Sequence, residues 1–170
     1  MSKALIDLIP PAELNEKLSH PYCELEPDFL CFEQYYWPVA EHVPTDYEIY
    51  DVGCYMAAQS YMFLNHREYY GIDCYDMYDS DTYIAPPRFK PENAMHFKMT
   101  GQQFIHDILP RIDQDKAYFV ASAVPDFVMT KLLFSVTKNC LVAYPGRIPM
   151  SKGISHYEIV AEIRKSEWRD

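Results

Sequence analysis

The chain has 170 residues, of which 49% are hydrophobic and 24% charged, a composition typical of a globular domain large enough to bury a core without staples. No stretch approaches the roughly 20 apolar residues that cross a membrane. The formal net charge of −10 disfavours direct nucleic-acid binding, because such binding depends on clustered lysine and arginine. It leaves open a basic protein partner, or an acidic surface that imitates nucleic acid.

The amino terminus and the cysteines indicate the compartment. The first residues carry one lysine and then an acid inside a short apolar run, unlike the basic start and long apolar middle of a signal peptide, so we expect cytoplasmic residence. Five cysteines without a C-x-x-C pair predict reduced thiols rather than a disulfide framework or a zinc ribbon. Six histidines show no pair at helical metal-ligand spacing, and we expect no metal site.

The segment 1–46 predicts a helical cap. A short helix is predicted over 12–20, after two prolines. A second is predicted over 28–41, where Pro38 disturbs the second half and an apolar face is formed by Phe29, Phe32, Tyr36 and Val39. We predict a single domain, 1–170, in which 1–46 is the cap and 47–170 is the sheet core.

The stretch 47–76 predicts a strand, a tight turn at Gly53, a helix and a second strand. An acidic residue stands at the tip of each strand, Asp51 on the first and Asp73 on the second. An acid about 20 residues past the first turn is what a ribose requires, because a carboxylate accepts hydrogen bonds from both hydroxyls. Asp73 fits this role, and the alternative is that it only caps the next segment.

The rest of the chain alternates between strands and helices. The segment 76–94 holds four acids and three prolines and predicts a loop, which either lies over a site or is a plain insertion. Strands are then predicted over 95–99, 117–124 and 140–144, with helices over 102–112 and 127–139. Alternating side chains predict an antiparallel edge strand over 156–163, with one face formed by Tyr157, Ile159, Ala161 and Ile163.

This alternation predicts a mostly parallel sheet with helices on both faces and an antiparallel C-terminal edge strand. Ligands of such sheets bind beyond the carboxyl ends of the strands, where the strand order reverses. Those ends are predicted at Asp51-Val52-Gly53, Asp73, Thr100-Gly101-Gln102, Ala121-Ser122 and Tyr144-Pro145.

The turn after the first strand reads Asp51-Val52-Gly53-Cys54-Tyr55-Met56-Ala57. It resembles the first motif of the class I S-adenosylmethionine-dependent methyltransferases, acid-x-Gly-x-Gly-x-Gly. The acid and the first glycine match, whereas Tyr55 and Ala57 replace the second and third glycines, which let the backbone approach a ligand closely. Asp73 matches the family's ribose-binding acid, and the order of elements from 47 to 144, about three-fifths of the chain, follows the family.

The resemblance implies an α/β fold, a Rossmann-like three-layer sandwich of abbreviated class I methyltransferase type. It also implies S-adenosylmethionine as cofactor, bound by Asp51, Gly53, Cys54, Tyr55, Asp73, Gln102 and Ser122. Gln102 or Gln103 stands where the family often has an acid facing the adenine amino group. The segment Val124-Pro125-Asp126-Phe127 lacks the Asn of the family's amino-methylating motif, so no catalytic residue is assigned. The residues 145–156 leave little room for the family's helix before its final hairpin.

Two functional hypotheses follow. The first is a small S-adenosylmethionine-dependent methyltransferase-like enzyme with an unknown acceptor, favoured by Asp51, Gly53 and Asp73. Methyl transfer mainly needs alignment of donor and acceptor, so a missing catalytic triad does not count against it. The second is a non-catalytic relative that acts as a protein-binding partner or inhibitor through an acidic, tyrosine-rich surface, favoured by Tyr55 and Ala57. The alternative for the fifteen tyrosines is that they fill the core and its rim.

Overall fold

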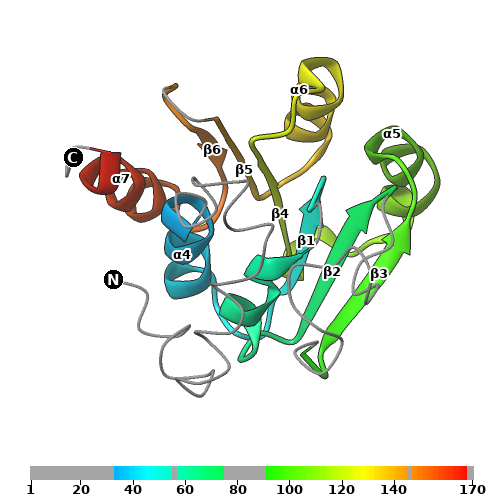
Figure 1. Cartoon of the computed structure of the whole chain (residues 1–170), viewed down its shortest axis with the longest axis horizontal. Helices are drawn as coiled ribbons and strands as arrows, with labels where there is room; N and C mark the ends of the chain where they lie inside the picture. The colour runs from blue at the N-terminus through cyan, green and yellow to red at the C-terminus, as the bar shows by residue number, and fades with distance from the viewer. Residues whose placement is uncertain (1–32, 55–56, 75–90, 145–146, 168–170) are drawn as a thin grey trace, which may run out of the picture.

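In the computed structural model, the described residues are 33–54, 57–74, 91–144 and 147–167. Their strands form one six-stranded sheet in the order β3-β2-β1-β4-β5-β6 (Figure 1). Strands β1 to β5 run parallel, and β6 pairs antiparallel with β5. The strands are β1 (Glu48–Val52), β2 (Glu68–Asp73), β3 (Ala94–Lys98), β4 (Ala117–Ser122), β5 (Cys140–Ala143) and β6 (Met150–Lys152).

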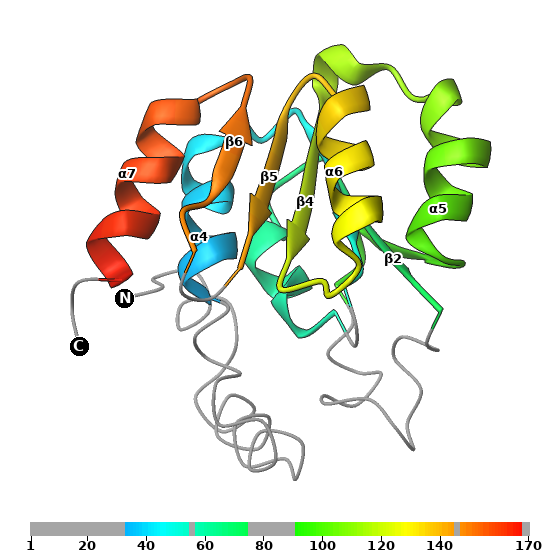
Figure 2. The same cartoon turned by 90° about the horizontal axis from the view of Figure 1, so that it is seen from above.

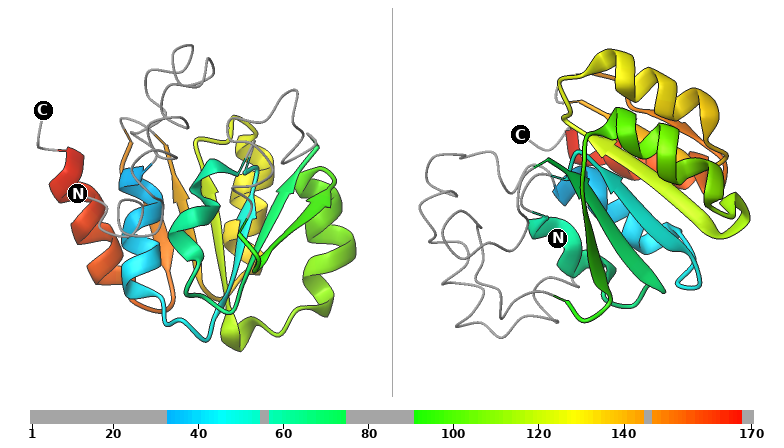
Figure 3. Two further views of the ribbon diagram at one scale, coloured as in Figure 1. Left: turned by 60° about the horizontal axis from the view of Figure 1, so that its bottom comes forward. Right: turned by 90° about the vertical axis from the view of Figure 1, so that its right-hand side faces the viewer.

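Helices cover both faces of the sheet, so the predicted three-layer, mostly parallel α/β fold with an antiparallel edge is confirmed (Figures 2 and 3). The first face is covered by α4 (Glu33–His42), the 3-10 helix η2 (Ala58–Phe63) and α7 (His156–Glu167). The second is covered by α6 (Phe127–Val136) and by a helical run made of α5 (Gly101–Gln103), η4 (Phe104–Ile108) and η5 (Leu109–Arg111). A short 3-10 helix, η6 (Gln114–Lys116), leads into β4.

Successive side chains of a strand point to opposite faces, and here both faces are core. In β4, Tyr118 and Val120 pack under α4 and α7, whereas Phe119 and Ala121 pack under η4 and α6. Every residue of β4 and β5 is buried as a result. This is why the continuous apolar runs of the sequence predicted both strands.

The cap and the first crossover differ in detail from the predictions. The predicted helix over 12–20, the first part of the helix over 28–41 and most of the loop over 76–94 lie outside the described residues. Helix α4 runs through Pro38 and buries Tyr36 and Val39, as the apolar pattern indicated. The crossover after β1 is a 3-10 helix rather than an α-helix, and it begins after Ala57 in left-handed conformation.

The predicted edge strand over 156–163 is wrong, because these residues form α7. Ile159 and Ile163 are fully buried and four residues apart, a spacing that fits a helical face as well as a strand face. Tyr157 is 82% exposed and Ala161 is also exposed, although both would share the strand face with the isoleucines. The antiparallel edge is formed instead by β6, which lies within 145–156, before the predicted strand.

The connection from β6 to α7 depends on buried Asn139. Its Nδ2 donates to the carbonyls of Gln114 and Ala117, and its Oδ1 accepts from the Ile154 amide at 2.9 Å. Gly153 directly precedes Ile154 and has a φ of 89°. A Cβ at Gly153 would lie 2.2 Å from Asn139 Oδ1. A glycine is therefore required where the chain turns into α7.

The helical assignment of 156–167 predicts which substitutions destabilise the protein. Ile159→Ala and Ile163→Ala should each lower the free energy of unfolding by about 2 to 5 kcal/mol, because both side chains are fully buried under the first face. Tyr157→Ala and Ala161→Asp should change it by less than about 0.5 kcal/mol. Urea denaturation measures all four, and comparable losses at Tyr157 and Ile159 would contradict the helix.

Candidate functional site

The carboxyl edge of the sheet brings together the tips of β1, β2 and β4. Strand order reverses between β1 and β4, since the chain leaves β1 toward β2 and returns to β4 on the other side. At the tip of β1 the amides of Gly53 and Cys54 both donate to the Ile72 carbonyl, at 2.7 and 3.2 Å. The turn is thereby tied to β2, and the predicted ligand edge is built from adjacent strand ends.

Gly53 has two structural requirements. Its φ of 78° lies in the left-handed region, which side chains other than glycine rarely adopt, and a Cβ there would lie 2.6 Å from Cγ2 of Val124. Val124 follows β4, so the two strand tips on either side of the reversal are in direct contact. The match to the family's first glycine is therefore explained by packing against Val124 and does not by itself indicate a ligand.

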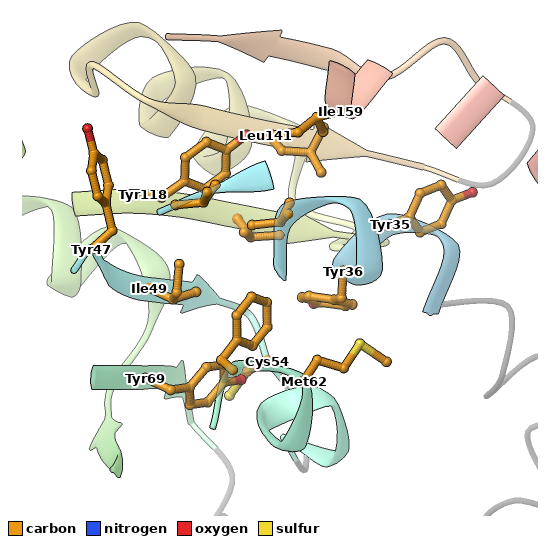
Figure 4. Packing of buried hydrophobic residues seen from close by; sticks show 14 of the residues in the cluster. Tyr35, Tyr36, Tyr47, Ile49, Cys54, Met62, Tyr69, Tyr118, Leu141 and Ile159 are labelled. Atoms are coloured by element: carbon orange, nitrogen blue, oxygen red, sulfur yellow. The ribbon is translucent and has the colours of Figure 1, made fainter. Parts of the chain in front are cut away.

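The Asp51 carboxylate is fully buried and bound by three side chains from different elements. Its Oδ1 accepts from the hydroxyl of Tyr36 at 2.9 Å. Its Oδ2 accepts from the hydroxyl of Tyr69 at 2.5 Å and from Nε2 of Gln59 at 2.6 Å. Figure 4 shows Tyr36 entering from α4 and Tyr69 from β2. One carboxylate thus joins α4, β1, β2 and η2.

Burial dominates the titration of this carboxyl. It raises the pKa of Asp51 from the ordinary 3.8 to about 6, although the hydrogen bonds from Tyr69, Gln59 and Tyr36 lower it. The same burial, followed by the Asp51 charge, raises the pKa of the Tyr36 hydroxyl, so Tyr36 remains a donor. Because both oxygens accept from the protein's own side chains, Asp51 organises the edge from within and does not present a free carboxylate.

Asp73 differs from Asp51 in exposure. It ends β2 at the same edge and is only partly buried. Its carbonyl accepts from the Met99 amide at 3.0 Å, which ties the tip of β2 to the residue after β3. Its Oδ1 accepts from the thiol of Cys74 at 3.5 Å. Part of Asp73 is therefore exposed to solvent at this edge.

Of the other predicted site residues, some lie at this edge and others lie beside it. Cys54 and Ser122 are buried at the tips of β1 and β4, and burial raises the pKa of the Cys54 thiol, so the thiol stays protonated. The Ser122 hydroxyl has no hydrogen bond of ordinary geometry, and it acts on the nearby Tyr36 hydroxyl, whose pKa it lowers. Gln102 is exposed and donates through Nε2 to Asp126, the residue that caps α6. Tyr55 lies outside the described residues.

Sequence reasoning missed the three donors to Asp51. Tyr36 was assigned only to an apolar helix face, and Gln59 and Tyr69 were given no role. The available signal was the acid itself: an aspartate inside a buried strand requires donors, although the sequence does not say which residues supply them. In the described ranges no group of three or more His, Cys, Asp and Glu side chains is arranged to hold a metal ion. Within the same ranges, no helix is long and apolar enough to cross a bilayer.

Comparison with solved structures finds a candidate methyltransferase of Streptococcus mutans crystallised in complex with SAH. The match has a TM-score of 0.42 and 10% sequence identity, and it covers 66% of this chain and 70% of the other. No protein-family profile and no curated protein sequence matches the chain.

The raised pKa of Asp51 predicts a pH dependence of stability. The folded protein binds the proton more tightly than the unfolded chain, so Asp51 stabilises the fold at low pH, and this contribution is lost as pH rises through 6. Relative to Asp51→Asn, which is neutral throughout, the wild-type free energy of unfolding should fall by about 2 kcal/mol between pH 4.5 and 7.5. Urea denaturation across this range measures the difference.

The matched control is Ile159→Ala, which removes a buried apolar side chain and keeps Asp51. Its difference from wild type should be nearly constant over the same range, because both proteins contain the same titrating groups. Parallel curves for wild type and Asp51→Asn would contradict the assigned titration of the buried carboxyl.

Proposed function

We propose that this chain is a methyltransferase-like protein that binds S-adenosylmethionine at the carboxyl edge of its sheet, with Asp73 as the ribose ligand. The observation that carries the proposal is a partly exposed acid at the tip of β2, beside the point where the strand order reverses. Open α/β sheets bind nucleotide-type ligands at this point, and a carboxylate there can accept from both ribose hydroxyls. The choice of S-adenosylmethionine comes from the motif that begins at Asp51.

The residues around Asp73 fit this ligand in part. The acid supplies the ribose acceptors, whereas the amides of Gly53 and Cys54 already donate to the Ile72 carbonyl. Asp51 is assigned a positioning role, because its carboxylate is occupied by Tyr36, Tyr69 and Gln59. By holding β1, β2 and α4 together it fixes where Asp73 and the turn lie. S-adenosylmethionine would supply an electrophilic methyl group, and the acceptor is not assigned.

Calorimetric titration with S-adenosylmethionine and S-adenosylhomocysteine tests the proposal. Wild type should bind at least one of them, and Asp73→Ala should weaken binding about tenfold or more, because two charge-assisted hydrogen bonds are lost. Glu92→Ala is the matched control, since it removes one exposed acid just before β3, at the opposite end of the strands. It should leave the affinity unchanged.

Two results would contradict the proposal in different ways. No binding of either ligand at millimolar concentration would refute cofactor binding by this protein. Binding that Asp73→Ala leaves intact would refute the ribose assignment alone. Thermal unfolding of Asp73→Ala should show an intact fold, so that a loss of binding is not a loss of structure.

One observation favours the second candidate, a non-catalytic methyltransferase-like protein that acts as a protein-binding partner or inhibitor. Val124 packs directly onto Gly53, so an apolar side chain lies over the turn that a cofactor would approach. If this contact blocks the ligand, Val124→Ala should create affinity for S-adenosylhomocysteine that wild type lacks. The same titration measures it, and a wild type that binds as tightly as Val124→Ala would reject the blocked edge.

A further inference from the structure

The large exposed apolar side chains of the described residues are concentrated in one region. Eight such side chains are exposed, and six of them belong to α6 or to the segment 147–152, which contains β6. Val128 is 79% exposed and Ile148 is 75% exposed. The others in the region are Phe127, Leu132, Val136 and Met150. Scattered apolar side chains are normal on a surface, whereas a contiguous group marks an interaction site.

The exposed apolar side chains of α6 lie on two sides of the helix, neither of which faces the sheet. Val128, Leu132 and Val136 recur every four residues and share one side. Phe127 and Phe134 are seven residues apart and share the other side, toward β6, where Arg147 lies over the Phe127 ring at 5.3 Å and Lys152 over the Phe134 ring at 5.0 Å. Met150 shares the strand face of Lys152, two residues away. We call the outward side of α6 together with 147–152 the α6–β6 surface.

The charge of this surface is opposite to that of the rest of the chain. The stretch 127–157 contains four lysines and arginines and no aspartate or glutamate, so the remaining residues carry a net charge of −14. Asp126, which precedes α6, and Asp115, on η6, are both already bound. Asp126 caps the helix and accepts from Gln102, and Asp115 pairs with Lys138 at 2.6 Å. Among the described residues, Lys131, Arg147 and Lys152 make no ion pair.

We propose that the α6–β6 surface binds a segment of another protein in which acidic side chains are interleaved with apolar ones. The exposed apolar side chains gain by burial against such a segment, and the three cations gain charged partners that the described residues do not give them. The rings hold Arg147 and Lys152 beside apolar neighbours, so a ligand must satisfy both kinds of contact at once. The inference does not depend on cofactor binding at the sheet edge.

The charge distribution favours a protein segment over an anionic bilayer or nucleic acid. Both of those present an extended negative surface, which the −14 carried by the rest of the chain would oppose. A single acidic segment contacts only the α6–β6 surface. At physiological ionic strength, charges beyond about 8 Å from the contact are largely screened. The positive charge of the α6–β6 surface therefore determines which segment it binds.

A selection of random displayed peptides on the full-length protein tests the proposal. Enriched peptides should combine acidic and apolar residues, and a synthetic copy of one should bind more weakly as salt concentration rises. The double variant Arg147→Glu with Lys152→Glu should lose affinity about tenfold or more. The variant Val128→Ser with Leu132→Ser should also lose affinity, because it removes exposed apolar surface without changing charge. Arg164→Glu, an exposed charge reversal on α7 across the sheet, should bind as wild type does.

Three results would overturn the proposal. One is a selection that yields no acidic, apolar peptide, and another is a peptide that binds either double variant as tightly as wild type. The third is cosedimentation with vesicles of equal phosphatidylserine and phosphatidylcholine that both double variants abolish, since the surface would then bind lipid. Circular dichroism and thermal unfolding should match wild type for each variant, because every substituted side chain is at least partly exposed. If one double variant is unfolded, the other still decides the outcome.

Discussion

The buried carboxylate of Asp51 is the interaction on which the carboxyl edge of the sheet depends. A charge in the core is costly unless donors replace its water, and here the donors come from three other elements: Tyr36 on α4, Tyr69 on β2 and Gln59 on η2. Removing any donor would leave part of a buried carboxylate unsatisfied. The network therefore fixes α4 and η2 against β1 and β2, two of the strands that form the predicted ligand edge.

This network changes what the acid of the β1 motif indicates. Because its role here is internal, the acid at the end of the first strand fits a cofactor-binding protein and a non-catalytic one equally well. The same holds for Gly53, whose backbone conformation and contact with Val124 already require a glycine. Asp73 is partly exposed at the same edge, so its substitution, rather than that of Asp51 or Gly53, distinguishes the two candidate functions.

The sequence predicted the elements whose pattern has a single solution. The runs at 117–121 and 140–143 are apolar throughout because both sheet faces are covered, and a buried parallel strand is the structure that fits them. The strand predicted over 156–163 is wrong because Ile159 and Ile163 are four residues apart. This spacing fits both the two-residue period of a strand and the 3.6-residue period of a helix. The partners of Asp51 could not be predicted, because Tyr36, Gln59 and Tyr69 are brought to it only by the folded topology.

The high tyrosine content of the chain is not matched by a high share of exposed tyrosines among the described residues. Of the nine tyrosines whose side chains are described, six are buried, and two of these bind Asp51. They supply large rings with polar tips to the interior, so a high tyrosine count need not produce a tyrosine-rich surface. The exposed apolar surface is formed instead by valine, leucine, isoleucine, methionine and Phe127, on a region without acids. The protein is acidic overall, but its α6–β6 surface is apolar and positively charged. This surface lies on the opposite side of the sheet from the Asp51 network.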